Sequence, residues 1–442
     1  MNDTAHYLRW LVLAGLGVTF LVGVSTAQPR KEVPPVGSLA GGNDAKLPQI
    51  FQPEKIAVNA KGAVVMDGDT GMVLLEKERD LKIHPASFVK VLTLYIVFDM
   101  LRSGKVKLTD DILISERSWK TGGSQMFLQV NSRVPLEELI KGIAVVSAND
   151  ACIAIAEHLY GSAENFATAM NTMAQKLGMK NSFFTNPHGL PDPLQYTTPY
   201  DMALLAKQYI QNFPEALRYH STLEYTYNGI TQRNRNPLLR KDETIDGLKT
   251  GFIAEAGYHL LLTAKKEARR SIVVVMGAAS PAIREKEARM LLNYGYQKFT
   301  IQSLYAKGEV LGKIPVWKGS TNTLAVVATE NGSVTLPAEY KSRVHEDRIL
   351  PANIVAPILK GQEVGKSVIK LDAEIIKSVP LIAQEDIPKA GFFKSLSHSV
   401  YLTGVSSLIG IGLFVVLGMV LAFLGAVLLK GRRSRRPSEL RI

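Results

Sequence analysis

The sequence predicts an α+β protein, because strand-like and helix-like patterns occur in separate blocks along the chain rather than in regular alternation. Two short apolar runs around a Gly-rich turn begin at Ala63. A block of helical patterns follows from Ser87 to about Phe213, and strand-like runs return at 259–264 and 271–277. Strands on both sides of a helical block predict a sheet with helices inserted and packed against it.

A second, smaller domain is predicted to follow this block. Segments such as 323–330 and 367–375 are short, alternate apolar with polar residues, and are separated by Gly and Pro. This pattern is typical of an all-β domain, which we place at 302–388. The larger domain then spans 57–300, after a Pro-rich leader or linker at 28–56.

Residues 1–27 have the features of a secretion signal. Arg9 precedes an uncharged stretch from Trp10 to Val24, and small residues stand before Gln28. About fifteen apolar residues are too few to span a bilayer, and small residues at this place suit a signal peptidase. We therefore expect cleavage, with a retained N-terminal anchor as the alternative.

The C-terminal run 405–429 contains no charged residue and is long enough for a helix that spans a membrane. An Arg-rich tail at 430–442 follows, and its positive charge predicts a cytoplasmic location. The folded domains and the juxtamembrane segment 389–404 are then expected on the outer, periplasmic face of the cytoplasmic membrane. Small residues four apart on this predicted helix would permit a weak dimer; they are Gly418, Ala422 and Ala426.

Composition excludes several other classes of protein. With 46% hydrophobic and 21% charged residues, the chain is expected to fold. The net charge is +12, but the tail contributes +5 of it, from six basic residues against Glu439. No basic stripe with interleaved aromatic residues and no zinc knuckle occurs, so nucleic acid is not expected as a partner. The single cysteine, Cys152, excludes an intramolecular disulfide.

Three short motifs together indicate nucleophilic chemistry on a serine. They are Ser-x-x-Lys at 87–90, Ser-x-Asn at 147–149 and Lys-Thr-Gly at 249–251. Each motif also occurs a second time, so a match alone does not identify the functional copy. The second copies are at 367–370, 320–322 and 120–122.

The expected structural context separates the copies. Ser87 follows Pro85 at the start of a predicted helix, where residues at i and i+3 share a face, so the amine of Lys90 can reach the hydroxyl. Ser367 lies in a predicted strand, where residues three apart point to opposite faces. Lys249 leads into the predicted hairpin, whereas the second Lys-Thr-Gly lies among helices.

With these motifs in this order, the chain resembles the low-molecular-mass penicillin-binding proteins that are serine D-Ala-D-Ala carboxypeptidases, from about Ala57 to Phe393. Other segments are similar to the same family, including GGSQMFL, HGL, RNRNPLL and DGLKTGF. The resemblance implies a fold like that of DD-peptidases and serine β-lactamases, an antiparallel sheet flanked by helices with a helical subdomain, followed by the family's β domain. Two departures are Val89, where the family commonly has Thr, and a spanning helix where family members often have an amphipathic one.

The resemblance also implies a role for each motif residue. Ser87 is expected to attack the penultimate D-Ala carbonyl of a peptidoglycan stem pentapeptide and to form an acyl-enzyme, with release of the terminal D-Ala. Lys90 is expected to take the Ser87 proton, for which it must be neutral. Burial and the charge of Lys249 are expected to lower its pKa. Ser147 is expected to relay the proton to the leaving amine.

The substrate is expected to bind along the second and third motifs. Asn149 suits the substrate amide, and Lys249 with Thr250 suits the terminal carboxylate, with Arg270 as a helper. β-Lactam antibiotics are expected to be covalent inhibitors at the same serine. Gly251, the last residue of the third motif, is also expected to bind the substrate. The backbone N–H groups of Ser87 and Phe252 are the expected oxyanion donors.

Two other functions would use the same residues. A serine β-lactamase shares the nucleophile, but class A enzymes use a Glu to activate water, and no Glu in a recognisable loop position occurs between Ser147 and Lys249. A catalytically idle scaffold that binds peptidoglycan is disfavoured by the complete set of motif residues. His188 could suggest a triad, or a metal site with His158 or His84, but the spacing matches no ligand motif. We interpret it as a loop-shaping residue and expect no metal or other cofactor.

Overall fold

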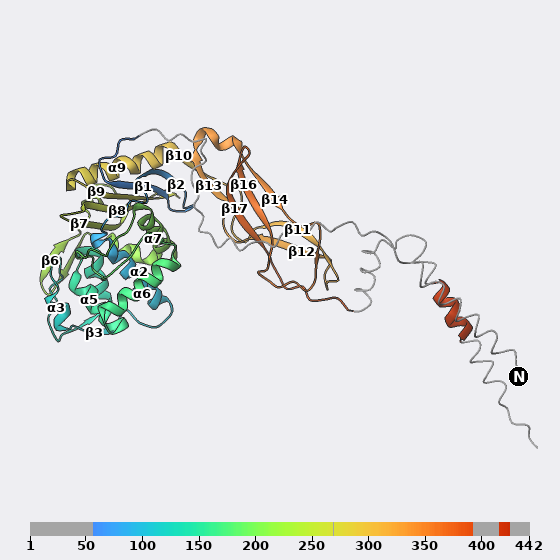
Figure 1. Ribbon diagram of the computed structural model, residues 1–442, viewed down its shortest axis with the longest axis horizontal. Coiled ribbons are helices and arrows are strands. Elements are labelled where there is room, and N and C mark those ends of the chain that lie inside the picture. The colour runs from blue at the N-terminus through green and yellow to red at the C-terminus, as the bar shows by residue number, and fades with distance from the viewer. Residues whose placement is uncertain (1–55, 268, 392–414, 425–442) are drawn as a thin grey trace, which may run out of the picture. The chain divides into compact units, whose positions relative to one another are not determined.

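The computed structural model describes residues 56–267, 269–391 and 415–424, and its larger domain is built on one antiparallel sheet (Figure 1). The five strands lie in the order β2-β1-β9-β8-β7, so β1 pairs with β9 although the whole helical block separates them in the chain. The prediction of an α+β fold is confirmed for this domain. The strands are β1 (Gly62–Asp67), β2 (Val73–Lys77), β7 (Ile245–Ile253), β8 (Gly257–Lys266) and β9 (Arg269–Ala278).

Both faces of this sheet are covered, which explains the nearly continuous apolar runs of β8 and β9. Val64 and Val274 belong to the core on the side of the helical block, whereas Val65 and Val275 belong to the core beneath α9 (Pro281–Lys298). Successive side chains of a strand point to opposite faces, so each face requires its own apolar residues. Figure 1 shows α9 on one side of the sheet and α2, α6 and α7 on the other.

Four longer helices form most of the helical block, and polar caps define where two of them begin. Ser162 accepts a hydrogen bond from a backbone N–H in the first turn of α6, and Thr198 does the same for α7. The longer helices are α2 (Val89–Arg102), α5 (Asn149–Tyr160), α6 (Ala163–Lys176) and α7 (Pro199–Asn212). The shorter elements are β3 (Asp111–Leu113), α3 (Glu116–Lys120), β4 (Arg133–Pro135), α4 (Leu136–Lys141), α8 (Leu217–His220), β5 (Glu224–Tyr227) and β6 (Ile230–Arg233).

The C-terminal domain is built from strands, so the all-β prediction is also confirmed. β10 (Phe299–Ser303) pairs with β13 (Ser333–Pro337), and six further strands form a sheet in the order β14-β16-β17-β12-β11-β15. This domain has its own buried core, which includes Ile314, Leu324 and Val326. The six strands are β11 (Val310–Trp317), β12 (Thr323–Ala328), β14 (Val344–Ile349), β15 (Ile354–Val355), β16 (Glu363–Leu371) and β17 (Glu374–Ala383).

Residues 415–424 form a helical segment with exposed side chains, within the run from which a membrane helix is predicted. Among the helices that the structure describes, none combines the length and the apolar character needed to cross a membrane. The predicted signal at 1–27, the leader up to residue 55, most of the juxtamembrane segment, the two ends of the predicted membrane helix and the basic tail lie outside the described residues.

Candidate active site

Ser87 lies in a short 3₁₀ helix, η1 (Ala86–Phe88), that continues directly into α2. Lys90 is in the first turn of α2, so the two side chains lie on one face at positions i and i+3. Lys90 Nζ donates a hydrogen bond to Ser87 Oγ at 3.1 Å. Ser87 is half-buried and Lys90 is fully buried, so the serine remains accessible while the amine is removed from water.

The environment of Lys90 favours its neutral form. Burial lowers the pKa of the amine to about 8, and the nearby Cys152 and Asp150 oppose this shift only in part. At pH 7 roughly a tenth of the amine is then neutral, against roughly one part in three thousand for a free lysine. Lys90 Nζ also donates to Asn149 Oδ1 at 2.7 Å and to the backbone carbonyl of His188. These two acceptors hold the amine beside the serine.

The loop that supplies the His188 carbonyl requires a glycine at its next residue. Gly189 has a φ of +84°, and a Cβ atom there would lie 1.9 Å from the Ala86 carbonyl oxygen. Ala86, which precedes the nucleophile, itself has a φ of 47°. The loop therefore packs against the backbone of the serine turn, and this close packing fixes the position of a Lys90 acceptor.

Ser147 reaches the nucleophile from a separate element. It follows the π-helical segment η2 (Gly142–Val146) in a left-handed conformation with a φ of 67°. Such a conformation is uncommon for a residue with a side chain, and it occurs often at functional sites. Ser147 Oγ donates a hydrogen bond to Ser87 Oγ at 3.1 Å. Two groups with exchangeable protons, one amine and one hydroxyl, thus contact the Ser87 oxygen.

Asn149 connects the second motif to Lys90 and to a facing loop. It is the first residue of α5 and is 3% exposed. Its Oδ1 accepts from Lys90, and its Nδ2 donates to the Gly122 carbonyl at 2.7 Å. A Cβ atom at Gly123 would lie 2.5 Å from Asn149 Nδ2, and the φ of +83° there also requires glycine. Gly123 therefore leaves room for the amide, and Gly122 supplies its acceptor.

Lys249 lies on β7, the edge strand of the sheet, and is 3% exposed. Its Nζ donates to the Thr250 carbonyl at 2.9 Å. Burial, followed by the charge of Lys90, lowers the pKa of Lys249 well below its ordinary value. Burial lowers the pKa of Lys90, as expected from the sequence, whereas the charge of Lys249, which was also expected to lower it, is not among the causes.

Strand β7 packs closely against the turn that carries Ser87. A Cβ atom at Gly251 would lie 3.2 Å from the Ala86 Cβ, so a larger residue there would displace the strand from the turn. Phe252 follows, is 52% exposed, and stacks on Tyr258 with ring centroids 4.3 Å apart. The close approach of Gly251 to Ala86 places the end of the third motif beside the turn that carries the nucleophile.

Arg270 is not brought to this site. Its guanidinium binds both carboxylate oxygens of Asp246, at 2.8 and 2.7 Å, and the Thr263 hydroxyl at 2.7 Å. In the register of the sheet, Arg270 of β9 lies opposite Lys265 of β8, whereas Lys249 of β7 lies opposite Leu261 of β8. The two cations therefore occupy different levels of the sheet. The hairpin register, which the sequence does not give, explains why the predicted helper lies elsewhere.

Arg235 is a cation near the site to which the sequence analysis gave no role. Its backbone N–H donates to the Val145 carbonyl at 3.3 Å, and its Nε donates to the Val146 carbonyl at 3.4 Å, directly before Ser147. Its charge also contributes to the lowered pKa of Lys249. The sequence signal was its place in the RNRNPLL segment, one of those similar to the carboxypeptidase family.

The serine and the lysines of the second copies at 367–370 and 120–122 lie outside this cluster, although the Gly122 carbonyl accepts a hydrogen bond from Asn149. Ser367 is buried in the C-terminal domain, where its hydroxyl accepts from Tyr305 and donates to Glu346. The amine of Lys370 is paired with Asp347 at 2.6 Å. In the other Lys-Thr-Gly, the lysine is on α3 and is paired with Glu116.

His188 contributes through its backbone carbonyl, and its ring organises the loop. Its Nδ1 accepts from the Leu190 N–H at 3.1 Å, and burial lowers the pKa of the ring to about 3. Within the described ranges, no group of three or more His, Cys, Asp or Glu side chains is arranged to hold a metal ion.

Comparison with family models assigns both folded domains. Residues 49–280 match the model described as D-alanyl-D-alanine carboxypeptidase, and residues 299–389 match that of the penicillin-binding protein 5 C-terminal domain. The D-alanyl-D-alanine carboxypeptidase DacC of Escherichia coli is 38% identical over 348 residues, which cover 77% of this chain and 87% of that protein. DacF of Bacillus subtilis is 36% identical over 352 residues, covering 78% and 90%.

Solved structures give the same result. Penicillin-binding protein 5 from Haemophilus influenzae is 36% identical, with a TM-score of 0.71 over 77% of this chain and 100% of that one. Penicillin-binding protein D2 from Listeria monocytogenes in its ampicillin-bound form is 27% identical, with a TM-score of 0.51 over 55% and 99%. With a serine, two lysines and a second serine gathered at the edge of its sheet, the chain belongs to the D-alanyl-D-alanine carboxypeptidase family and is an enzyme of that class.

Proposed function

We propose that the protein removes the terminal D-Ala from peptidoglycan stem pentapeptides through an acyl-enzyme on Ser87. The observation that carries this proposal is the arrangement around the Ser87 oxygen. A fully buried amine with a pKa of about 8 lies 3.1 Å from it, and the Ser147 hydroxyl lies 3.1 Å from it on a separate element.

In the acylation step, neutral Lys90 accepts the proton of the Ser87 hydroxyl while Ser87 Oγ attacks the carbonyl carbon of the penultimate D-Ala. The negative charge that develops on the carbonyl oxygen is stabilised by the backbone N–H groups of Ser87 and Phe252. The C–N bond then breaks as Ser147 passes its hydroxyl proton to the leaving amine and takes up the proton held by Lys90, so that Lys90 is neutral again. In the second step Lys90 accepts a proton from a water molecule that attacks the ester carbonyl. The bond between the acyl carbon and Ser87 Oγ breaks, and Lys90 returns the proton to Ser87 Oγ.

The terminal carboxylate of the substrate binds to Lys249, Thr250 and Arg235. A carboxylate beside Lys249 favours the charged form of this amine and therefore raises its pKa. The resulting positive charge opposes protonation of Lys90 and shifts it further towards the neutral base. Binding of an anionic substrate thus favours a charged Lys249 and a neutral Lys90.

Penicillin acylates the same serine in this proposal. A β-lactam carries a carboxylate and a reactive carbonyl, and the cluster provides cations and a nucleophile for the two groups. The ampicillin-bound form of the Listeria monocytogenes relative supports this, as do the names of the penicillin-binding relatives.

The proposal includes an anchor in the cytoplasmic membrane. The uncharged run 405–429, the Arg-rich tail after it and the signal-like residues 1–27 support it. The two folded domains then lie on the periplasmic face, where peptidoglycan is located, and the tail is cytoplasmic. The small residues of the predicted helix allow a weak dimer.

The decisive experiment is incubation of the full-length protein in detergent with a pentapeptide that ends in D-Ala-D-Ala, followed by an assay of free D-Ala. Release of D-Ala with slow penicillin turnover is the expected result. Rapid penicillin turnover without D-Ala would identify a β-lactamase, and neither activity would identify a scaffold. Among the described residues, the hydrogen-bond partners of Ser87 Oγ are Lys90 and Ser147, and neither is the carboxylate that a class A β-lactamase uses.

A further inference from the structure

A cavity of about 580 Å³ lies away from the Ser87 cluster, where the β1–β2 turn and α7 meet strands of the C-terminal domain. Thr70, one of its lining residues, shares a hydrogen bond of 2.9 Å with Thr335. Positions along strand β9 give the separation of the cavity from the Ser87 cluster. Val274 of β9 lies opposite Leu261 of β8, which lies opposite Lys249 of β7, whereas Arg269 of β9 lines the cavity. At 3.4 Å per residue the two levels are ~17 Å apart along the strand.

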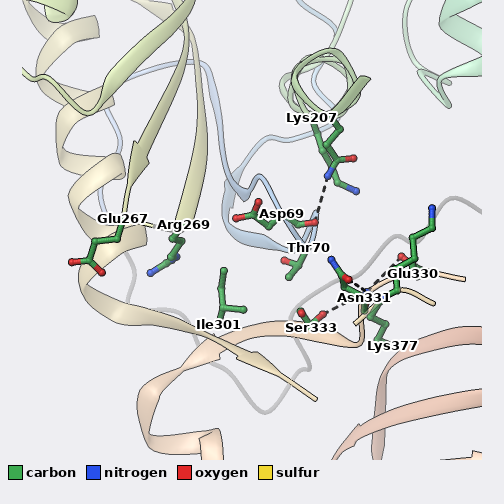
Figure 2. Close-up of a pocket in the computed structure, with 12 residues that line it drawn as sticks. Asp69, Thr70, Lys207, Glu267, Arg269, Ile301, Glu330, Asn331, Ser333 and Lys377 are labelled. Atoms are coloured by element: carbon green, nitrogen blue, oxygen red, sulfur yellow. Dashed lines mark hydrogen bonds and ion pairs between the residues drawn. The ribbon is translucent and has the colours of Figure 1, made fainter. Parts of the chain in front are cut away.

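The cavity is lined by charged and polar side chains from both domains. Figure 2 shows Lys207 on the side of α7, and Glu330, Asn331 and Lys377 on the side of the C-terminal domain. Lys377 is already satisfied, since its Nζ donates to the Asn331 carbonyl at 2.7 Å and lies 3.5 Å from the Glu330 carboxylate. The terminal nitrogens of Arg269 donate to two backbone carbonyls at the end of α9, both at 2.5 Å, and its Nε lies 3.6 Å from the Asp67 carboxylate.

Lys207 differs from these cations. Among the described residues, none is a hydrogen-bond or ion-pair partner of its amine. The amine rests on the β1–β2 turn, since a Cβ atom at Gly71 would lie 2.7 Å from Lys207 Nζ. Burial lowers the pKa of Lys207, and the charge of Glu330 opposes this shift without forming an ion pair. The carboxylates of Asp67 and Asp69 act in the same direction as Glu330, but none of the three pairs with the amine. A half-buried ammonium without a hydrogen-bond or ion-pair partner is available to an anion in the cavity beside it.

We propose that this cavity binds a carboxylate of a second stem peptide of the same peptidoglycan polymer, with Lys207 as the binding cation. The choice of polymer rests on the proposed carboxypeptidase function. Stem peptides carry free carboxylates along with amide and amino groups. Asn331 and Gln211 suit the amides, and Asp69 suits an amino group. The site would hold a strand on the enzyme while neighbouring stems are processed at Ser87.

The test compares two substrates of the full-length enzyme in detergent, a free pentapeptide and soluble uncrosslinked peptidoglycan strands. At strand concentrations below saturation, Lys207→Gln should lower the rate of D-Ala release from strands by about tenfold. This is the typical effect of losing one hydrogen bond to a charged group. It should leave release from the free pentapeptide within about twofold of the wild type, and Lys207→Arg should restore most of the loss. Lys176→Gln, at an exposed lysine of α6, is the matched control and should change neither rate.

Equal losses on both substrates would show a structural role for Lys207 and overturn the proposal, as would wild-type rates on both. A loss on strands with Lys176→Gln as large as that with Lys207→Gln would show a general charge effect and also overturn it. Competition by glycan strands stripped of peptide would assign the cavity to sugar instead of carboxylate. If the wild type released no D-Ala from the pentapeptide, the proposed function would fail. The cavity proposal would then be decided by comparing the binding of strands to Ser87→Ala and to the double variant with Lys207→Gln. Weaker binding by the double variant would support it, and equal binding would overturn it.

Discussion

Replacing Lys90 with Arg tests the general base, because a guanidinium keeps the positive charge but stays protonated near neutral pH. Burial lowers the pKa of Lys90 from 10.5 to about 8. This shift gives roughly 300 times more neutral amine at pH 7 than an unshifted lysine would have. Arg has no comparable neutral fraction, so acylation by a fluorescent penicillin should fall by about 10²–10⁴-fold, the range associated with general-base catalysis.

The pH dependence of the wild type gives a second measure of the same group. Because the neutral form is the active base, the second-order acylation rate should rise about tenfold per unit up to pH 8 and level off above it. Timed labelling of the full-length protein from pH 6 to 10 measures this. A rate that does not change between pH 6 and 8, or a near-normal rate in Lys90→Arg, would move the base to another residue, with Ser147 as the next candidate.

Three further predictions concern the substrate carboxylate, stability and topology. Arg235→Gln should raise KM for a D-Ala-D-Ala peptide by about tenfold with little change in kcat. Arg270→Gln should instead lower the melting temperature, since Asp246 loses its partner. Equal effects of the two variants on KM would contradict the assignment of Arg235 to the substrate carboxylate. Lys90→Met should be more stable than the wild type at pH 7, by up to ~3 kcal/mol less what the lost hydrogen bonds contribute. The pKa of Lys90 in the folded state lies below its value in the unfolded state, so the wild type gains stability as the pH rises from about 8 to 10.5. The difference in stability between Lys90→Met and the wild type should therefore disappear over this window. Urea unfolding at both ends of the window measures the difference, and a variant less stable than the wild type at pH 7 would refute the prediction. A tag after Ile442 should resist protease added to the outer face of spheroplasts, and digestion of the tag while the membrane is intact would exclude a spanning helix.

The fold class followed from the sequence because the apolar patterns are local. Alternating runs and helical periods depend on near neighbours, so the two strand blocks, the helical block between them and the all-β domain were predictable. The pairing of β1 with β9 was not predictable from these patterns, since it joins residues at opposite ends of the domain. Strand order and register depend on such distant contacts.

The same limit applies to the site. Ser87 and Lys90 are three residues apart on one turn, so their contact followed from helix geometry. The places of Arg235 and Arg270 depend on how the hairpin and the 233–239 segment pack, and no local pattern gives that. The left-handed conformation of Ser147 and the close packing of Gly189 on Ala86 likewise appear only in three dimensions.

The central claim is that Ser87 becomes covalently attached to the substrate, and identification of the acylated residue tests it most directly. The full-length protein is treated with penicillin, digested, and the adduct is located by peptide mass spectrometry. The account predicts one adduct on the peptide that contains Ser87, and its complete loss in Ser87→Ala with an unchanged melting temperature. An adduct on Ser147 or Ser367, or labelling that persists in a folded Ser87→Ala protein, would contradict the account.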